Sequence, residues 1–298
     1  MRDIPRPSTA TQGEPLATWA LWALMTAVVV MTYSRVDPAV TYHVSRDGLD
    51  GGLSRAVTLV NFPIALVAIA LVLIAMAVLP AVAWWAAAPA IALCATIPWF
   101  VDQDDLDARW VNAIPALGVS IALVLTFAAA HRAGRALAPR RPWDGLRIGI
   151  AACVAVVSLP WIAAELGVHF PGDVFMGEEL GREQDGTRIA AVHLGHHHGT
   201  DGALLVLTAL LLSRVAIERR ALRSVTFAYL GLMLAYGGVN FAQDAWNEQV
   251  VKRGWTDDGI PSALLPGVRP IWAVVLVLAV LATIVLLREN KRTSYSAP

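Results

Sequence analysis

Four histidines of this 298-residue chain lie close together at the start of an apolar segment, and an aspartate follows them. They are His193, His196, His197 and His198, followed by Asp201. On an α-helix, the spacing of His193, His197 and Asp201 places their side chains on one face. Imidazole and carboxylate groups spaced in this way can share one divalent transition-metal ion, such as zinc, copper or iron. This stretch is therefore the first candidate metal site.

The length of the apolar segment predicts how deep these side chains lie in a membrane. The run 203–213 is too short to cross a bilayer, because a spanning helix needs about 20 residues. Counting back about 20 residues from Arg214, where a basic stretch begins, reaches His193. A helix over 193–214 would hold the histidines at the depth of one lipid leaflet, where polar groups need protein or water partners. The alternative is a solvated histidine-rich loop, since three glycines interrupt this stretch.

Two other predicted helix ends carry acids or histidine on the same side of the membrane. Glu165 and His169 continue the face of Trp161 at the end of a predicted helix, and Asp244 follows another. We expect Glu165 and Asp201 to act as general acid or base, and His169 and Asp244 to be further metal ligands. The alternative is that these side chains reach up to the interface or emerge into water.

The composition predicts an all-α, polytopic integral membrane protein. Hydrophobic residues make up 57% of the chain and charged residues 15%, against about 25% charged in soluble domains. The apolar runs predict eight transmembrane helices, at 16–33, 56–78, 80–99, 113–131, 147–166, 193–214, 224–243 and 269–287. The formal net charge is zero, which gives no indication of a nucleic-acid partner. The expected partners are the lipid bilayer and a lipid or small-molecule ligand.

The distribution of basic residues predicts the orientation. Of the Lys and Arg residues, 14 lie in the two termini and the connections expected on their side, and 9 in the opposite segments. The positive-inside rule then places both termini in the cytoplasm. Arginine far outnumbers lysine, a bias common in GC-rich bacteria, so we expect a bacterial plasma membrane. The predicted organisation is a disordered N-terminus (1–15), a four-helix half (16–131), a basic linker (132–147), a second four-helix half (148–287) and a tail (288–298).

Short local matches indicate that the two halves could be repeats. His43 precedes Gly-Leu-Asp-Gly-Gly-Leu at 48–53, and His193 precedes Gly-Thr-Asp-Gly-Ala-Leu at 199–204. An even number of helices in each half would make the repeat parallel, about an axis along the membrane normal. The alternative is chance, because glycine is common at helix ends.

Two spacings in the histidine stretch resemble motifs of known membrane enzymes. His193-x-x-His196-His197 resembles one histidine box of membrane fatty-acid desaturases, which need several boxes, and the chain has too few other histidines. His193-x-x-x-His197 resembles a late motif of ceramidase-like and adiponectin-receptor-like hydrolases, whose early Ser-x-x-x-His motif this sequence lacks. Each resemblance covers only the motif, and neither assigns a family.

The leading functional hypothesis is a metal-dependent membrane enzyme, a hydrolase or an oxidoreductase, with its site in the outer half of the membrane. A transporter or metal-handling protein is the alternative, although no predicted helix carries an ionisable residue at its midplane, where carriers usually place one. A non-catalytic membrane subunit is the third possibility.

Overall fold

The structure is a computed structural model that describes residues 11–35, 52–97, 109–166, 180–182, 188–190, 198–251, 254–264 and 269–295. Within these residues the chain is almost wholly helical, as the sequence predicts. The exception is an antiparallel pair of three-residue strands, β1 (Leu180–Arg182) and β2 (Arg188–Ala190). The α-helices are α1 (Gly13–Arg35), α3 (Gly52–Ala75), α4 (Trp84–Cys94), α6 (Ala113–Ala133), α7 (Asp144–Val157), α8 (Leu159–Leu166), α9 (His198–Leu212), α10 (Arg220–Trp246) and α11 (Ile271–Tyr295).

Five predicted spans coincide with helices that are long and apolar enough to cross a membrane. By length and composition these are Gly13–Arg35, Ala56–Ala75, Trp110–Ala133, Arg220–Val251 and Ile271–Asn290. In α11 only 17% of the spanning window is buried inside the protein. An apolar surface of this extent is unusual on a soluble protein, and it fits contact with lipid. The five helices fit a membrane protein.

The predicted span 147–166 is interrupted and forms two helices, α7 and α8. The break falls at Ser158, two residues before Pro160. Proline lacks an N–H and its ring crowds the preceding turn, so it kinks or ends a helix. Ser158 Oγ donates a hydrogen bond to the Val154 carbonyl at 2.7 Å, and the Ile162 amide donates to the Ser158 carbonyl at 3.0 Å. These two bonds continue the helical hydrogen bonding across the break, so α7 and α8 are joined by a kink.

Two other predicted spans coincide with shorter helices. In the segment 80–99 a 3-10 turn (Ala81–Ala83) leads into α4, which ends at Cys94. In the segment 193–214 the described helix α9 begins at His198, because 191–197 lie outside the described residues. The count of eight spans and the repeat therefore stay predictions.

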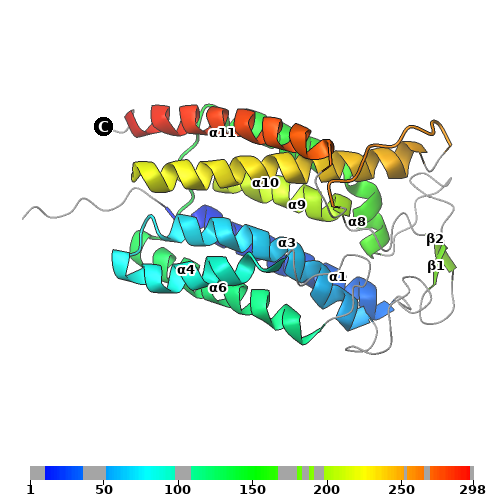
Figure 1. Ribbon diagram of the computed structural model, residues 1–298, viewed down its shortest axis with the longest axis horizontal. Helices are drawn as coiled ribbons and strands as arrows, with labels where there is room; N and C mark the ends of the chain where they lie inside the picture. The colour runs from blue at the N-terminus through cyan, green and yellow to red at the C-terminus, as the bar shows by residue number, and fades with distance from the viewer. Residues whose placement is uncertain are drawn as a thin grey trace, which may run out of the picture.

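The helices form two bundles that lie against each other (Figure 1). The first bundle contains α1, α3, α4 and α6, and α3 is its core, with residues 67–76 all buried. The second bundle contains α7 to α11, and α10 packs between α9 and α11. The bundles meet where α1 and α3 contact α8, α9 and α10. The interface is therefore built mainly from helices that also pack inside their own bundle.

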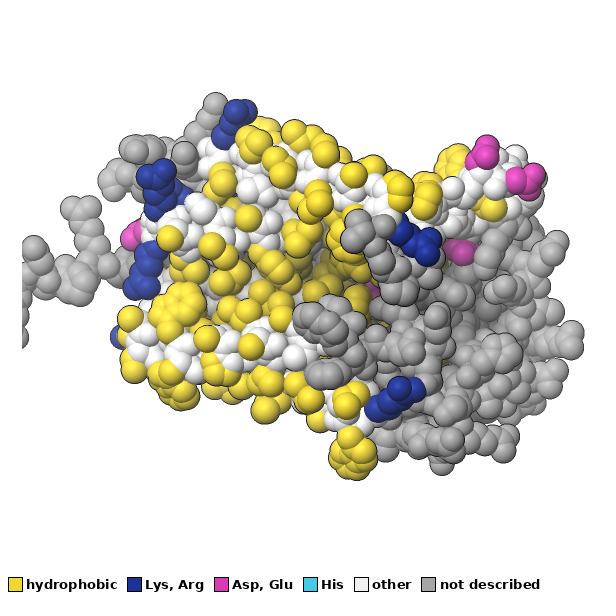
Figure 2. Space-filling model, viewed as in Figure 1, with side chains coloured by type: hydrophobic (Ala, Val, Ile, Leu, Met, Phe, Trp, Pro, Cys, Tyr) yellow, Lys and Arg dark blue, Asp and Glu magenta, His cyan; other side chains and the backbone are white. Residues whose placement is uncertain are grey.

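The two ends of the bundles differ in charge. We call the end where α1 begins and α11 finishes the terminal end, and the opposite end, which carries β1 and β2, the loop end (Figure 1). Hydrophobic side chains cover the middle of the face shown in Figure 2, and Lys or Arg side chains gather at its terminal end. The exposed arginines described there are Arg132, Arg135, Arg140, Arg219, Arg220 and Arg288.

Candidate functional site

At the loop end, the last turn of α10 contacts the first turn of α9. Asp244 of α10 is 4% exposed, and its Oδ2 accepts a hydrogen bond from the Gly199 amide at 3.0 Å. The first amides of a helix have no partner within the helix, and its N-terminus carries partial positive charge. The buried carboxylate therefore caps α9 at Gly199, which lies two residues after His197 in the sequence.

Helix α8 reaches the same point through Trp161. The indole is 3% exposed and packs edge-on against Phe241 of α10, with ring centroids 5.6 Å apart at 75°. A Cβ atom at Gly199 would clash with both the Trp161 ring and Asp244 Oδ2. Only glycine fits between these two side chains, so the ends of α8 and α10 converge on the start of α9.

A second glycine contact holds α9 and α10 together one turn deeper. A Cβ at Gly202 would lie 2.6 Å from the Gly237 carbonyl oxygen, and a Cβ at Gly237 would lie 2.7 Å from Leu205 Cβ. The two backbones therefore approach closely, as small residues allow in membrane helix pairs. This packing fixes the position of Asp244 along the axis of α9, next to its first turn.

The end of α10 buries further polar groups beside Asp244. Asn240 is 3% exposed, and its Oδ1 has no hydrogen-bond partner among the described residues. Glu248 is 8% exposed and lies in a π-helical turn, Asn247–Val251, that continues α10. Such turns widen a helix and are frequent at functional sites. The loop end thus buries two acids one turn apart on a single helix.

The turn after α10 is covered by residues 254–264. The Asn247 side chain accepts from the Ile260 amide at 3.1 Å and donates to the Ile260 carbonyl at 3.4 Å. The Trp246 indole donates to the Asp258 carbonyl at 2.7 Å. These three bonds hold the covering loop against the helix end that carries Asp244 and Glu248.

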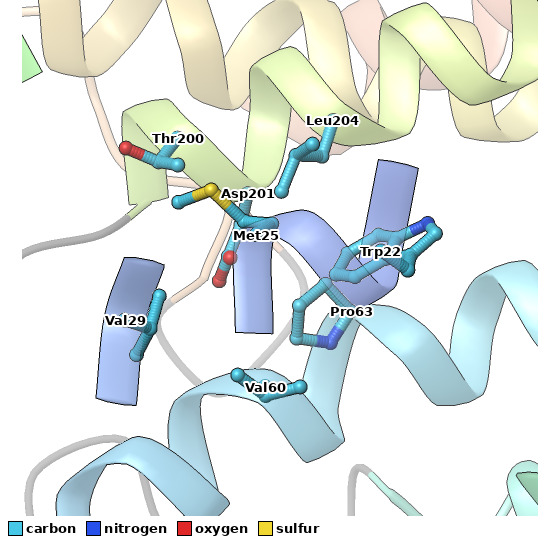
Figure 3. A pocket seen from close by; sticks show the side chains of 8 residues that line it. All are labelled: Trp22, Met25, Val29, Val60, Pro63, Thr200, Asp201 and Leu204. Carbon is cyan, nitrogen blue, oxygen red and sulfur yellow. The ribbon is translucent and has the colours of Figure 1, made fainter. Parts of the chain in front are cut away.

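Asp201 lines a small cavity between the two bundles. The cavity has a volume of about 10 Å³, close to the space that one water molecule occupies. Figure 3 shows the Asp201 carboxylate directed from α9 toward side chains of α1 and α3. The lining residues are Trp22, Met25, Val29, Val60, Pro63, Thr200, Asp201 and Leu204. The carboxylate therefore faces a mostly apolar wall at the bundle interface.

The structure describes only part of the predicted site. Asp201 and Asp244 are described, and both lie at the loop end near the start of α9. Glu165 lies in α8, one turn after Trp161, and its side chain is outside the described residues. The remaining predicted ligands, His169, His193, His196 and His197, also lie outside them. Among the described residues, no group of three or more His, Cys, Asp or Glu side chains is placed to hold a metal ion.

The terminal end contains a buried ion cluster. Arg147 of α7 makes a two-pronged contact with Glu289 of α11, in which Nη1 donates to Oε1 at 2.9 Å and Nη2 donates to Oε2. Arg147 Nη1 also lies 3.2 Å from Asp144 Oδ1, and its Nε donates to Ser213 Oγ at 3.0 Å. Every nitrogen of this guanidinium is used, and α7 is joined to α11 and to Ser213, the residue that follows α9.

The same cluster continues to the start of α1. Glu14 is fully buried, and its Oε1 accepts from the Ala138 amide at 2.8 Å and lies 3.8 Å from Arg214 Nε. Arg214 Nη2 lies 3.4 Å from Asp144 Oδ2 and donates to the Ala138 carbonyl at 2.7 Å. Arg141 is also buried, and burial lowers the pKa of its guanidinium while the charge of Glu289 opposes that shift. The cluster links both bundles at their terminal end.

The cluster is the main feature that sequence reasoning did not find. Helix α1 begins at Gly13, inside the segment 1–15 expected to be disordered, and Glu289 belongs to the segment expected to be a tail. Two signals were available, an Asp144–Arg147 pair at helical i,i+3 spacing and an isolated acid at 289 among basic residues. Neither signal names the partner, because Arg147 and Glu289 are 142 residues apart.

The chain matches no protein-family model, no curated protein and no solved structure.

Proposed function

We propose that this chain is an eight-span protein of a bacterial plasma membrane, with a metal site in the outer half of the membrane that serves an enzymatic reaction. The observation that supports the site is the bond from the Gly199 amide to Asp244. It brings a buried carboxylate to the first turn of the helix that the histidine stretch leads into. The terminal end, with its exposed arginines, would then face the cytoplasm.

The donor set fits a divalent transition metal. His193, His196, His197 and His169 offer imidazoles and Asp244 a carboxylate, and such mixed sets suit zinc, copper or iron. Buried carboxylates are costly unless a cation, a proton or hydrogen bonds compensate them. The loop end buries Asp244 and Glu248, so a cation there would offset negative charge.

The chemistry that we propose is hydrolysis or oxidation of a lipid or small substrate. A bound metal ion would supply Lewis acidity or redox capacity. Glu165, one turn beyond the buried Trp161, and Asp201, facing the interface cavity, would hold or move protons. The Asp244 cap would fix the first turn of α9 and thus the direction from which the histidines approach.

Metal content of the detergent-purified chain, measured by elemental mass spectrometry, tests the site. We expect about one metal ion per chain in the wild type and none in His193→Ala/His197→Ala. His131→Ala, which changes an exposed histidine at the opposite end, is the matched control and should keep the metal. Equal content in the double variant would overturn the site. No metal in any protein after loading with zinc, copper and iron would favour a non-catalytic subunit.

A metal-handling or transport function is the second candidate, and the position of Asp201 favours it. This acid lies between the two bundles and not on the outer surface of one of them. Uptake of radioactive zinc into sealed vesicles separates the two functions, because an enzyme confined to the outer half moves no metal across.

A further inference from the structure

The segment that joins α6 to α7 passes from the first bundle to the second at the terminal end. We call residues 134–143 the α6–α7 connection, and they form neither helix nor strand. The Gln12 amide donates a hydrogen bond to the Gly134 carbonyl at 3.3 Å, and the Gly13 amide donates to the Ala136 carbonyl at 3.1 Å. A Cβ atom at Gly13 would lie 2.5 Å from the Ala136 carbonyl oxygen. The start of α1 therefore holds the first part of the connection in close contact.

The terminal ion cluster holds the second part of the connection. The Ala138 amide donates to Glu14 Oε1 at 2.8 Å, and the Ala138 carbonyl accepts from Arg214 Nη2 at 2.7 Å. Further along, the Arg141 amide donates to Asp144 Oδ2 at 2.9 Å. Hydrogen bonds from both bundles therefore fix the course of the connection over most of its length.

The connection exposes basic and apolar side chains between these points. Arg135 and Arg140 are exposed, and so is Arg132 in the last turn of α6. Leu137 is 57% exposed and Trp143 is 40% exposed. Among the described residues, no acid forms an ion pair with any of these three arginines. Cationic and apolar side chains thus project from one backbone segment that the bundles hold in place.

The surface around the connection is strongly basic. Of the residues that the structure describes at the terminal end, six arginines are exposed, against one exposed acid, Glu218. The buried acids Glu14, Asp144 and Glu289 do not offset this charge, because each is paired with an arginine of the ion cluster. Lys and Arg side chains gather at this end of the face shown in Figure 2. The charge of the surface is therefore complementary to an anionic partner.

We propose that the α6–α7 connection is a docking surface for anionic phospholipids. A guanidinium group matches the geometry of a phosphate with two parallel hydrogen bonds, and Arg135 and Arg140 would bind the headgroups in this way. Leu137 and Trp143 would lie at the boundary between headgroups and acyl chains, where exposed Leu and Trp side chains are favourable. Because the connection is already held in place, less conformational entropy is lost on binding. The proposal goes beyond the enzyme function, which requires no lipid at this end.

The test is native mass spectrometry of the full chain in non-ionic detergent micelles, with phosphatidylglycerol or phosphatidylcholine added stepwise. We expect the wild type to bind the first phosphatidylglycerol about tenfold more tightly than the first phosphatidylcholine, because basic residues near a membrane surface attract anionic lipids. In Arg135→Gln/Arg140→Gln this preference should fall to about twofold or less. The measurement needs no metal, so its outcome is independent of the proposed metal site.

The matched control is Arg219→Gln/Arg220→Gln, which removes two exposed positive charges from the same end but not from the connection. It should keep most of the preference. Equal losses in the two double variants would overturn the proposal, because the total charge of the end would then attract the lipid. An unchanged preference in Arg135→Gln/Arg140→Gln would also overturn it.

Two further measurements separate charge from folding, and a lipid from a free anion. Arg135→Lys/Arg140→Lys keeps both charges and should keep most of the preference; a loss as large as that of the glutamine variant would contradict an electrostatic role. Glycerol 3-phosphate carries an anionic phosphate without acyl chains and should compete poorly with phosphatidylglycerol. Displacement of the lipid by an equal concentration of glycerol 3-phosphate would indicate a site for free phosphate esters and overturn the lipid proposal.

Discussion

The two ends of the molecule bury charge in opposite ways. At the terminal end each buried acid among the described residues lies within 4.0 Å of an arginine nitrogen, in the pairs Glu14–Arg214, Asp144–Arg147 and Glu289–Arg147. At the loop end the buried charged residues among those described are Asp244 and Glu248, both acids. Among the arginines described at that end, Arg109 and Arg269 are exposed and Arg35 is half-buried.

The terminal end uses buried charge to hold helices together, and we propose that the loop end uses it for binding. Paired charges compensate one another, and breaking a pair costs more than the pair itself contributes, so the terminal cluster fixes the positions of the helices. Two buried acids one turn apart concentrate negative charge, which favours a cation or a proton in their surroundings. The two acids at the loop end are the physical reason for proposing the functional site there.

The largest expected effect is on the terminal cluster. Glu289→Gln removes the charge that Arg147 holds with two nitrogens and leaves a buried guanidinium poorly compensated. We expect the free energy of unfolding to fall by about 3 kcal/mol. Denaturant titration in mixed micelles measures it. The neighbouring exposed residue provides the control, since Arg288→Gln should change stability by less than about 0.5 kcal/mol. Similar losses in both would contradict the structural role.

An intermediate loss of stability is expected from a substitution where α8, α9 and α10 converge. Gly199→Ala places a Cβ against the Trp161 ring and Asp244 Oδ2, and we expect a loss of about 1–3 kcal/mol from this overpacking. Gly238→Ala is the matched control, because nothing lies within 4 Å of its Cβ, and alanine should stabilise the helix by about 0.5–1 kcal/mol. If both alanines stabilise the protein, the helix ends do not meet at Gly199.

The smallest effect is expected at Arg141, although this side chain is 5% exposed. Its Nε and Nη1 have no hydrogen-bond partner among the described residues, so its burial is poorly compensated. Replacing it by an apolar side chain, Arg141→Met, should change the free energy of unfolding by less than about 1 kcal/mol. Arg147→Met, measured in the same titration, should cost several times more. Equal losses in the free energy of unfolding would mean that burial alone, and not ion pairing, sets the contribution of these arginines to stability.

The helices were predictable because their signal is local. Long apolar windows such as those of α3 and α11 show in the sequence whatever lies around them. The break at Ser158 was harder to place, since a proline near a helix start can begin, kink or end a helix. The early start of α1 was not predicted, because Glu14 is polar and is buried only through contacts with residues 138 and 214.

The location of two of the candidate residues was predictable for the same reason. Spacing along single helices pointed to Asp201 and Asp244, and the structure places both at the loop end. That Asp244 caps α9 could not be read from spacing, because 45 residues separate it from Gly199. The Asp144–Arg147 spacing is a local signal for the terminal cluster, but the strongest pair, Arg147–Glu289, joins two helices far apart in the chain.

The most direct test is thermal unfolding with and without added zinc, copper or iron, on the wild type, Asp244→Asn and Glu289→Gln. Asparagine keeps an acceptor for the Gly199 amide, so Asp244→Asn should unfold near the wild-type temperature. It should lose the increase in unfolding temperature that added metal produces in the wild type. Glu289→Gln should unfold at a lower temperature and keep that rise. A full metal-induced rise in Asp244→Asn, or none in the wild type with any of the three metals, would contradict a metal site at the loop end.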